Sequence, residues 1–210
     1  MKKNNIMSID AKTVKELRDK TGAGMMDCKN ALKESDGNIE NAIDYLRKTG
    51  IAKAEKKGSR DTKEGIIYSY IHAGGRLGVL IEVNCETDFV AKTDGFQELV
   101  HNLSMQIAAT NPQALDRELL TEDVVSREKN IYAEQAQSSG KPANIIEKMV
   151  EGRINKFYQE VCLMEQTYIK NPDKKVKDLI TESIASLGEN ISINRYIRFA
   201  IGESPTNGQA

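Results

Sequence analysis

The stretch Leu77-Gly78-Val79-Leu80-Ile81-Glu82-Val83-Asn84-Cys85 is rich in aliphatic side chains, which is typical of a β-strand. Before it, Gly65-Ile66-Ile67-Tyr68-Ser69-Tyr70-Ile71-His72 is β-branched and aromatic, and Ala73-Gly74-Gly75-Arg76 supplies the turn. Two such runs around a glycine-containing turn predict a β-hairpin. Near the end of the chain, apolar residues largely alternate from Ile191 to Phe199, which predicts a half-buried strand able to join the same sheet.

Helical patterns surround these strands. In several stretches, apolar residues recur at steps of three and four. Segments that contain Gly and Pro separate these stretches. Helices are therefore expected at about 95–110, 121–137, 142–168 and 175–187. The second and third flank Ser138-Ser139-Gly140-Lys141-Pro142, so they predict an antiparallel helical hairpin of about 121–168. Residues 204–210 offer no large apolar side chain to anchor them, and a frayed tail is expected.

The beginning of the chain predicts three short helices. Asp10 can cap the first, Gly24 opens the second, and Asn38 can cap a third that Thr49-Gly50 closes. After them comes a charged stretch without large apolar groups, which we interpret as a linker that can be helical at its start. The predicted division is a three-helix domain at 1–52, a linker at 53–64 and a core at 65–210.

Composition bounds the class of protein. With 210 residues, 39% hydrophobic and 29% charged, the chain can bury a core and is globular rather than disordered. No apolar run is long enough to cross a membrane and no secretory signal is evident, so a cytoplasmic protein is expected. Cys28, Cys85 and Cys162 are widely spaced and predict reduced thiols rather than disulfides or a zinc site. The basic residues of the first segment are interleaved with acids and lack aromatic platforms, so nucleic-acid binding is not expected.

Motifs for covalent chemistry or nucleotide binding are missing from the sequence. His72 and His101 are its only histidines, no glycine-rich loop precedes Lys-Ser or Lys-Thr, and no nucleophile elbow is present. The expectation is therefore a binding protein with no catalytic residue, no cofactor, no bound metal and no nucleotide site of its own. An enzyme that uses scattered carboxylates such as Glu82 and Glu86 remains an alternative.

The segment Thr87-Asp88-Phe89-Val90, here called the probe segment, lies between a predicted strand and a predicted helix. Thr87 or Asp88 can cap the next helix while Phe89 and Val90 enter the core. Alternatively, Phe89 wedges into a partner and Asp88 accepts hydrogen bonds from it. The residues alone leave both interpretations open.

Met25-Met26 raises the same question. Adjacent helical residues point about 100° apart, so both cannot face one small core equally. At least one of them is expected at a contact surface, with core packing as the alternative.

Segments spread over nearly the whole chain match one family in order. They are Val14–Arg18, Thr21–Lys29 with Ala31-Leu32, Glu82–Ala91, Ser139–Pro142, Glu147–Arg153 and Gly188–Ile191. In these segments the chain resembles the elongation factor Ts family. The resemblance implies an α+β fold with an N-terminal ubiquitin-associated-like domain, and the release of GDP from elongation factor Tu.

The resemblance also implies roles for particular residues. Thr87, Asp88, Phe89 and Val90 match the segment that inserts beside the partner's nucleotide and helps to dislodge its magnesium ion. Arg18, Met25 and Met26 match the face that meets the partner's nucleotide-binding domain, and His72 matches a further contact position.

The chain has room for one core subdomain where longer members have two. It therefore resembles the short form, for which a homodimer that supplies the second half is expected. A competing hypothesis is a ubiquitin-associated-like adaptor that binds a partner without changing its nucleotide kinetics.

Overall fold

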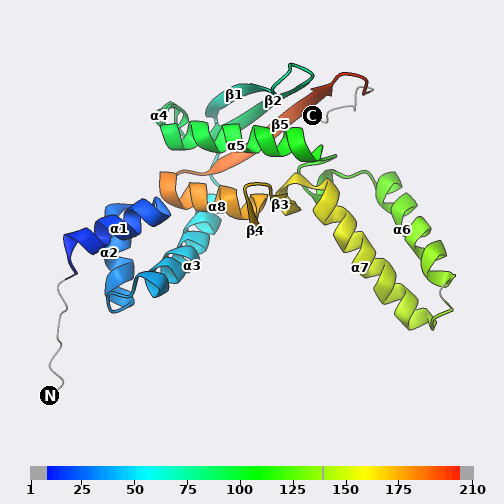
Figure 1. The fold of residues 1–210 in the computed structure, drawn as a ribbon, viewed down its shortest axis with the longest axis horizontal. Coiled ribbons are helices and arrows are strands. Elements are labelled where there is room, and N and C mark those ends of the chain that lie inside the picture. The colour runs from blue at the N-terminus through cyan, green and yellow to red at the C-terminus, as the bar shows by residue number, and fades with distance from the viewer. Residues whose placement is uncertain (1–8, 139, 204–210) are drawn as a thin grey trace.

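The computed structural model describes residues 9–138 and 140–203, so the expectation for the tail at 204–210 lies outside the described residues. A three-stranded antiparallel sheet contains β1 (Glu64–Ile71), β2 (Leu77–Cys85) and β5 (Ile191–Ala200) in the order β1-β2-β5. This confirms the β-hairpin and the third strand (Figure 1). The central strand is β2, which pairs with β1 on one side and with β5 on the other.

Three helices cover one face of this sheet: α4 (Asp88–Ala91), α5 (Asp94–Thr110) and α8 (Val176–Leu187). Alternate residues of β2 point toward them and are buried, namely Val79, Ile81, Val83 and Cys85. A bulge in β5 after Ile193 shifts the alternation by one residue, so that Tyr196 faces the same core as Ile193. The main core therefore lies between the sheet and α5 with α8.

The N-terminal helices are α1 (Ala11–Thr21), α2 (Met25–Glu34) and α3 (Ile39–Lys57), and they enclose a small core of their own. Asp10 caps α1 by accepting a hydrogen bond from the Lys12 amide at 3.3 Å, and Asn38 caps α3 through the Asn41 amide at 2.9 Å. Gly22 ends α1 in the left-handed conformation with φ 66°. The three predicted helices are confirmed.

The predicted end of the third helix at Thr49-Gly50 is wrong, because α3 continues to Lys57. A Cβ atom at Gly50 would lie 3.2 Å from Ala185 Cβ of α8, so this glycine permits close helix packing instead of ending the helix. One turn later, Ala54 is buried in the main core. The first five residues of the predicted linker therefore belong to α3.

The helical hairpin is confirmed as α6 (Glu122–Gln137) and α7 (Ala143–Val161), but its predicted extent to residue 168 is wrong. Cys162 is extended, and the chain continues through the short 3-10 helix η2 (Leu163–Glu165) and the strands β3 (Thr167–Tyr168) and β4 (Asn171–Lys175). The reason is tertiary: Leu163 is fully buried in the main core, and Gln166 Oε1 accepts from Gln106 at 3.1 Å and Thr110 at 2.7 Å.

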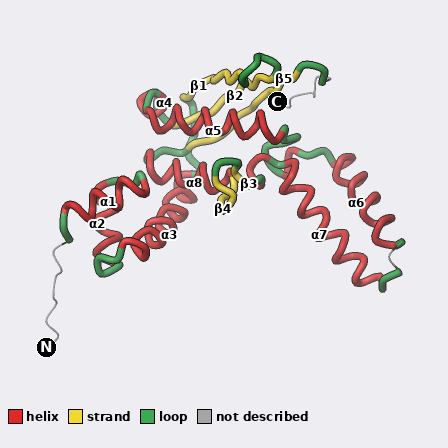
Figure 2. Tube along the Cα trace, in the orientation of Figure 1, coloured by secondary structure: helices red, strands yellow, loops and turns green. Residues whose placement is uncertain are grey.

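The third core of the molecule is small and lies at the helical hairpin. It is formed by Ala114, Leu120, Ile154, Phe157 and Cys162. Another 3-10 helix, η1 (Arg117–Leu119), lies at its base. Figure 2 shows the N-terminal helices and the helical hairpin extending away from the sheet at opposite ends of α8.

Candidate partner-binding site

The probe segment starts at the end of β2 and includes most of the single-turn helix α4. Thr87 is the N-cap of α4: its hydroxyl accepts from the Val90 amide at 3.4 Å and its carbonyl from the Ala91 amide at 3.3 Å. Ala91 is buried and Val90 packs partly against the main core. These inward contacts anchor α4 and determine which way its other side chains point.

Phe89 points the opposite way, and 80% of its surface is exposed. Successive helical residues are rotated by about 100°, so the inward placement of Val90 and Ala91 leaves Phe89 outside. The cap interpretation is confirmed for Thr87 and partial core packing for Val90, whereas core packing is wrong for Phe89. A large apolar side chain on a short, anchored helix is suited to contact with another molecule.

Asp88 directly precedes Phe89 in the chain, and half of its side chain is exposed. Its carboxylate accepts from the Lys92 ammonium at 2.6 Å, which lowers the pKa of Asp88 below its ordinary value. The segment therefore presents an ionised acid next to an exposed aromatic ring.

The second group of predicted site residues lies on the N-terminal helices. Met25 and Met26 are 48% and 64% exposed, while Cys28 and Leu32 of the same helix are buried. Arg18 is exposed on α1. Core packing is therefore wrong for both methionines, which place flexible apolar side chains at the surface.

His72 lies at the β-hairpin turn and is exposed. Its backbone amide donates to the Leu77 carbonyl at 2.8 Å, and its Nδ1 shares a hydrogen bond of 2.9 Å with the Tyr70 hydroxyl. The other histidine, His101, shares one of 3.0 Å with Tyr68. The two imidazoles are thus bound to tyrosines, and the structure pairs neither with Glu82 or Glu86.

The carboxylates considered for an enzyme have structural partners. Glu82 accepts from Asn194 and Arg195, both at 2.8 Å, and these contacts lower its pKa. Glu86 accepts from the Asn190 amide at 2.7 Å, which lowers its pKa as well. Over residues 9–138 and 140–203, no group of three or more His, Cys, Asp or Glu side chains is arranged to hold a metal ion.

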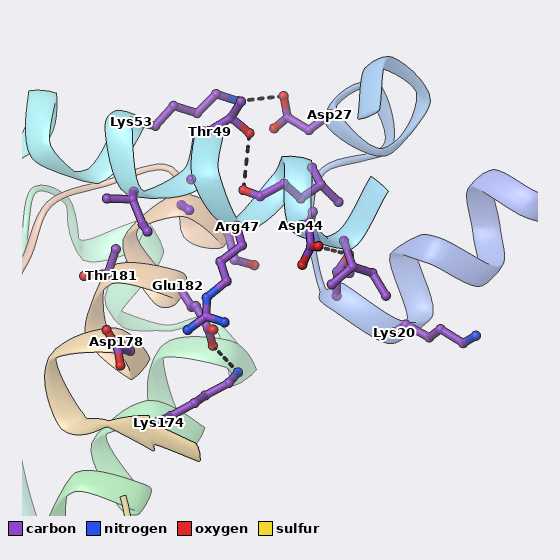
Figure 3. Close-up of a pocket in the computed structure, with 18 residues that line it drawn as sticks. Lys20, Asp27, Asp44, Arg47, Thr49, Lys53, Lys174, Asp178, Thr181 and Glu182 are labelled. Atoms are coloured by element: carbon purple, nitrogen blue, oxygen red, sulfur yellow. Dashed lines mark hydrogen bonds and ion pairs between the residues drawn. The ribbon is translucent and has the colours of Figure 1, made fainter. Parts of the chain in front are cut away.

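One cavity of about 280 Å³ lies between the N-terminal helices and α8 (Figure 3). Two ion pairs lie among its lining residues: Lys53 contacts Asp27 at 2.6 Å, and Lys174 contacts Glu182 at 2.7 Å. Its charged lining residues are Lys20, Arg47, Lys53, Lys174, Asp27, Asp44, Asp178 and Glu182, four of each sign. This balance does not favour the phosphates of a nucleotide.

Glu189, for which no role was predicted, lies behind the probe segment and accepts a hydrogen bond from the Thr87 amide at 2.9 Å. The feature of the sequence that could have indicated it was the segment Gly188–Ile191, which matches the family.

None of the helices in the described part of the chain is long and apolar enough to span a membrane. Exposed apolar side chains on well-anchored supports are typical of a protein that binds another macromolecule.

The comparisons with known proteins make this class specific. The Elongation factor TS family model matches residues 3–203. Elongation factor Ts of Geobacter metallireducens is 58% identical over 94% of this chain and 91% of that protein. The Syntrophomonas wolfei protein is 58% identical over 93% and 91%, and that of Desulfosudis oleivorans 55% over 93% and 99%. The chain belongs to the elongation factor Ts family, the nucleotide exchange factors for elongation factor Tu in translation elongation, and with 210 residues it is a short form.

Proposed function

We propose that this chain binds elongation factor Tu·GDP in the cytoplasm and releases GDP and magnesium by inserting the probe segment beside the nucleotide. The observation that carries the proposal is the exposure of Phe89 on a helix that Val90 and Ala91 anchor in the core. An apolar ring held in this way can enter a partner without the cost of leaving its own core.

Exchange requires only differential binding. A factor speeds GDP release when it binds the nucleotide-free partner more tightly than the GDP-bound one. Phe89 stabilises a loop arrangement of the partner that is incompatible with bound magnesium, and Asp88 accepts hydrogen bonds from that loop. Loss of the ion removes positive charge that screens the phosphates, so GDP leaves faster.

The N-terminal helices supply a second contact in this proposal. Arg18, Met25 and Met26 meet the partner's nucleotide-binding domain, and His72 adds a contact from the β-hairpin turn. Their exposure supports this assignment. The chain would then act as a three-helix binding domain and an exchange core at 65–210, connected through the last turns of α3, which ends at Lys57, and residues 58–64.

We further propose that two copies of the chain pair through the outer face of the sheet, the face opposite α5. Exposed apolar residues gather there in register: Ile71 pairs with Gly78, which pairs with Phe199, and Leu80 lies in the next row. The outer face also carries Ile67 and Ile197. A contiguous apolar face of this kind is typical of an interaction surface.

Stopped-flow release of a fluorescent GDP from elongation factor Tu tests the exchange proposal. Phe89→Ala is expected to lower the release rate at least about tenfold, as loss of a buried aromatic anchor does at an interface. Leu119→Ala is the matched control, because Leu119 is an exposed apolar residue at the base of the helical hairpin. An unchanged rate with wild-type protein would contradict the proposal, and binding without acceleration would support the adaptor hypothesis.

Sedimentation velocity over a range of concentrations tests the pairing. Leu80→Lys is expected to shift a dimer to monomers because it places a charge in the apolar face. If the wild-type chain is a monomer at every concentration, the pairing proposal is contradicted. The exchange proposal does not depend on that result.

A further inference from the structure

The turn between α8 and β5, Gly188–Asn190, lies directly behind the probe segment. The carboxylate of Glu189 accepts three hydrogen bonds from the first residue of this segment and the residue before it: from the Glu86 amide at 3.1 Å, the Thr87 amide at 2.9 Å and the Thr87 hydroxyl at 2.7 Å. A carboxylate with two backbone donors and one hydroxyl donor holds that backbone in one orientation.

The Thr87 hydroxyl has two roles in this arrangement. Its proton is directed to Glu189 Oε1, while its oxygen accepts from the Val90 amide as the cap of α4. Glu189 therefore determines the direction of the cap. A helix of one turn is unstable on its own, so the position of Phe89 depends on such external contacts.

The two loops are also linked in the reverse direction. The Asn190 amide donates to Glu86 Oε1 at 2.7 Å, so each loop donates a backbone N–H to a carboxylate of the other. Arg60 approaches the same Glu86 carboxylate at 3.4 Å. Neither loop can shift without breaking bonds of the other.

The same turn contacts the end of α3. Asn190 Nδ2 donates to the Arg60 carbonyl at 2.8 Å, and the Lys57 ammonium donates to the Gly188 carbonyl at 2.5 Å. Because α3 packs with α1 and α2, the turn connects the support of Met25 and Met26 with the support of Phe89.

We propose that Glu189 is a positioning residue for nucleotide exchange, which through Thr87 holds Phe89 at a fixed place relative to the surface of Met25 and Met26. This inference rests on the proposed function of the probe segment. A fixed spacing between two contact places lets a factor engage both on one partner without the cost of ordering them during binding. Displacement of a positioned group by about 1 Å can cost on the order of a hundredfold in rate.

The experiment measures GDP release from elongation factor Tu as a function of factor concentration, with full-length variants. Glu189→Ala is expected to lower the maximal release rate about tenfold and change the half-saturating concentration less than about threefold, because the surface contacts remain. Glu189→Gln keeps the length and one acceptor oxygen and is expected to restore part of the rate. Glu182→Gln removes a carboxylate contact from α8, the helix that precedes the turn of Glu189, and is the control, with a wild-type rate.

Two further measurements separate positioning from general stability. Hydrogen exchange is expected to accelerate at the Glu86 and Thr87 amides in Glu189→Ala but not at the amides of β2. The double variant Phe89→Ala/Glu189→Ala is expected to be no slower than Phe89→Ala, since Glu189 acts through the probe segment.

A wild-type maximal rate in Glu189→Ala, or additive losses in the double variant, would overturn the inference while the role of Phe89 stands. If Phe89→Ala itself exchanges at the wild-type rate, the proposed function fails instead. If Glu189→Ala does not fold, Glu189→Gln decides: a wild-type rate despite faster exchange at the Thr87 amide would overturn the inference.

Discussion

Gly50 of α3 faces Ala185 of α8 so closely that a Cβ atom added at Gly50 would lie 3.2 Å from the Cβ of Ala185. Gly50→Leu should therefore push the two helices apart and lower the free energy of unfolding by about 1–3 kcal/mol. Gly50→Ala should have a small net effect, because a gain of about 1 kcal/mol in helix propensity offsets the tight contact.

Urea unfolding followed by circular dichroism checks this prediction. Gly152 in the middle of α7 is the matched control, since a Cβ atom there would meet nothing within 4 Å. Gly152→Ala should raise the unfolding midpoint. If Gly50→Leu and Gly152→Leu lowered the free energy of unfolding equally, the close packing of α3 on α8 would be contradicted.

The two phenylalanines Phe89 and Phe96 should differ sharply in their contribution to stability. Phe89 is 80% exposed, so Phe89→Ala should change the free energy of unfolding by less than about 0.5 kcal/mol. Phe96 is fully buried in the main core, and Phe96→Ala should cost about 3–5 kcal/mol. Thermal melting of both variants measures the difference, and a large loss from Phe89→Ala would mean that its ring packs in the core.

Arg117 should hold the base of the helical hairpin. Its guanidinium contacts both Glu165 oxygens, donates to Asn155 at 3.2 Å and lies 4.3 Å from the centre of the Tyr158 ring. Arg117→Lys cannot reproduce this planar geometry, so we expect a loss of about 1 kcal/mol and faster hydrogen exchange in α6 and α7. Arg195→Lys, which changes an ion pair in the sheet, should leave exchange in α6 and α7 unchanged.

Stability should fall on acidification below about pH 4.5. Hydrogen bonds from Asn194, the Asn190 amide and Arg117 lower the pKa values of Glu82, Glu86 and Glu165, respectively, below the ordinary 4.5. A pKa lower in the folded than in the unfolded chain gives stabilisation that is complete above the unfolded value. It is lost as the pH falls through the folded value.

Glu86→Gln should therefore have a lower urea midpoint than the wild type at pH 7. Near pH 3, the difference between the midpoints of the variant and the wild type should be smaller. Identical differences at the two pH values would show that ionisation of Glu86 contributes nothing to stability.

Local patterns were sufficient for the sheet and for most helices, because strand alternation and caps such as Asp10 act within a few residues. They were insufficient where distant segments decide. Gly50 resembles a helix stop until α8 supplies the reason for a glycine. The spacing of Val161, Met164 and Tyr168 suits a helix, yet burial of Leu163 and the contacts of Gln166 with α5 favour another path.

The candidate site could be predicted from the sequence only in part. Its residues could be chosen from the sequence, but the outward direction of Phe89 could not, because an aromatic residue beside Val90 is equally suited to a core. The support from Glu189 was also hidden, since it joins positions that lie far apart along the chain.

The pairing of β2 with β5 has a consequence for synthesis of the chain. Leu77 pairs with Ala200 and Cys85 with Ile191, so one edge of the most apolar strand stays open until β5 has been synthesised and has left the ribosome. An unpaired apolar edge is a site for aggregation. Nascent chains that stop before Ile191 should therefore depend on chaperones, and the last ten residues of the sheet act as the closing step of folding.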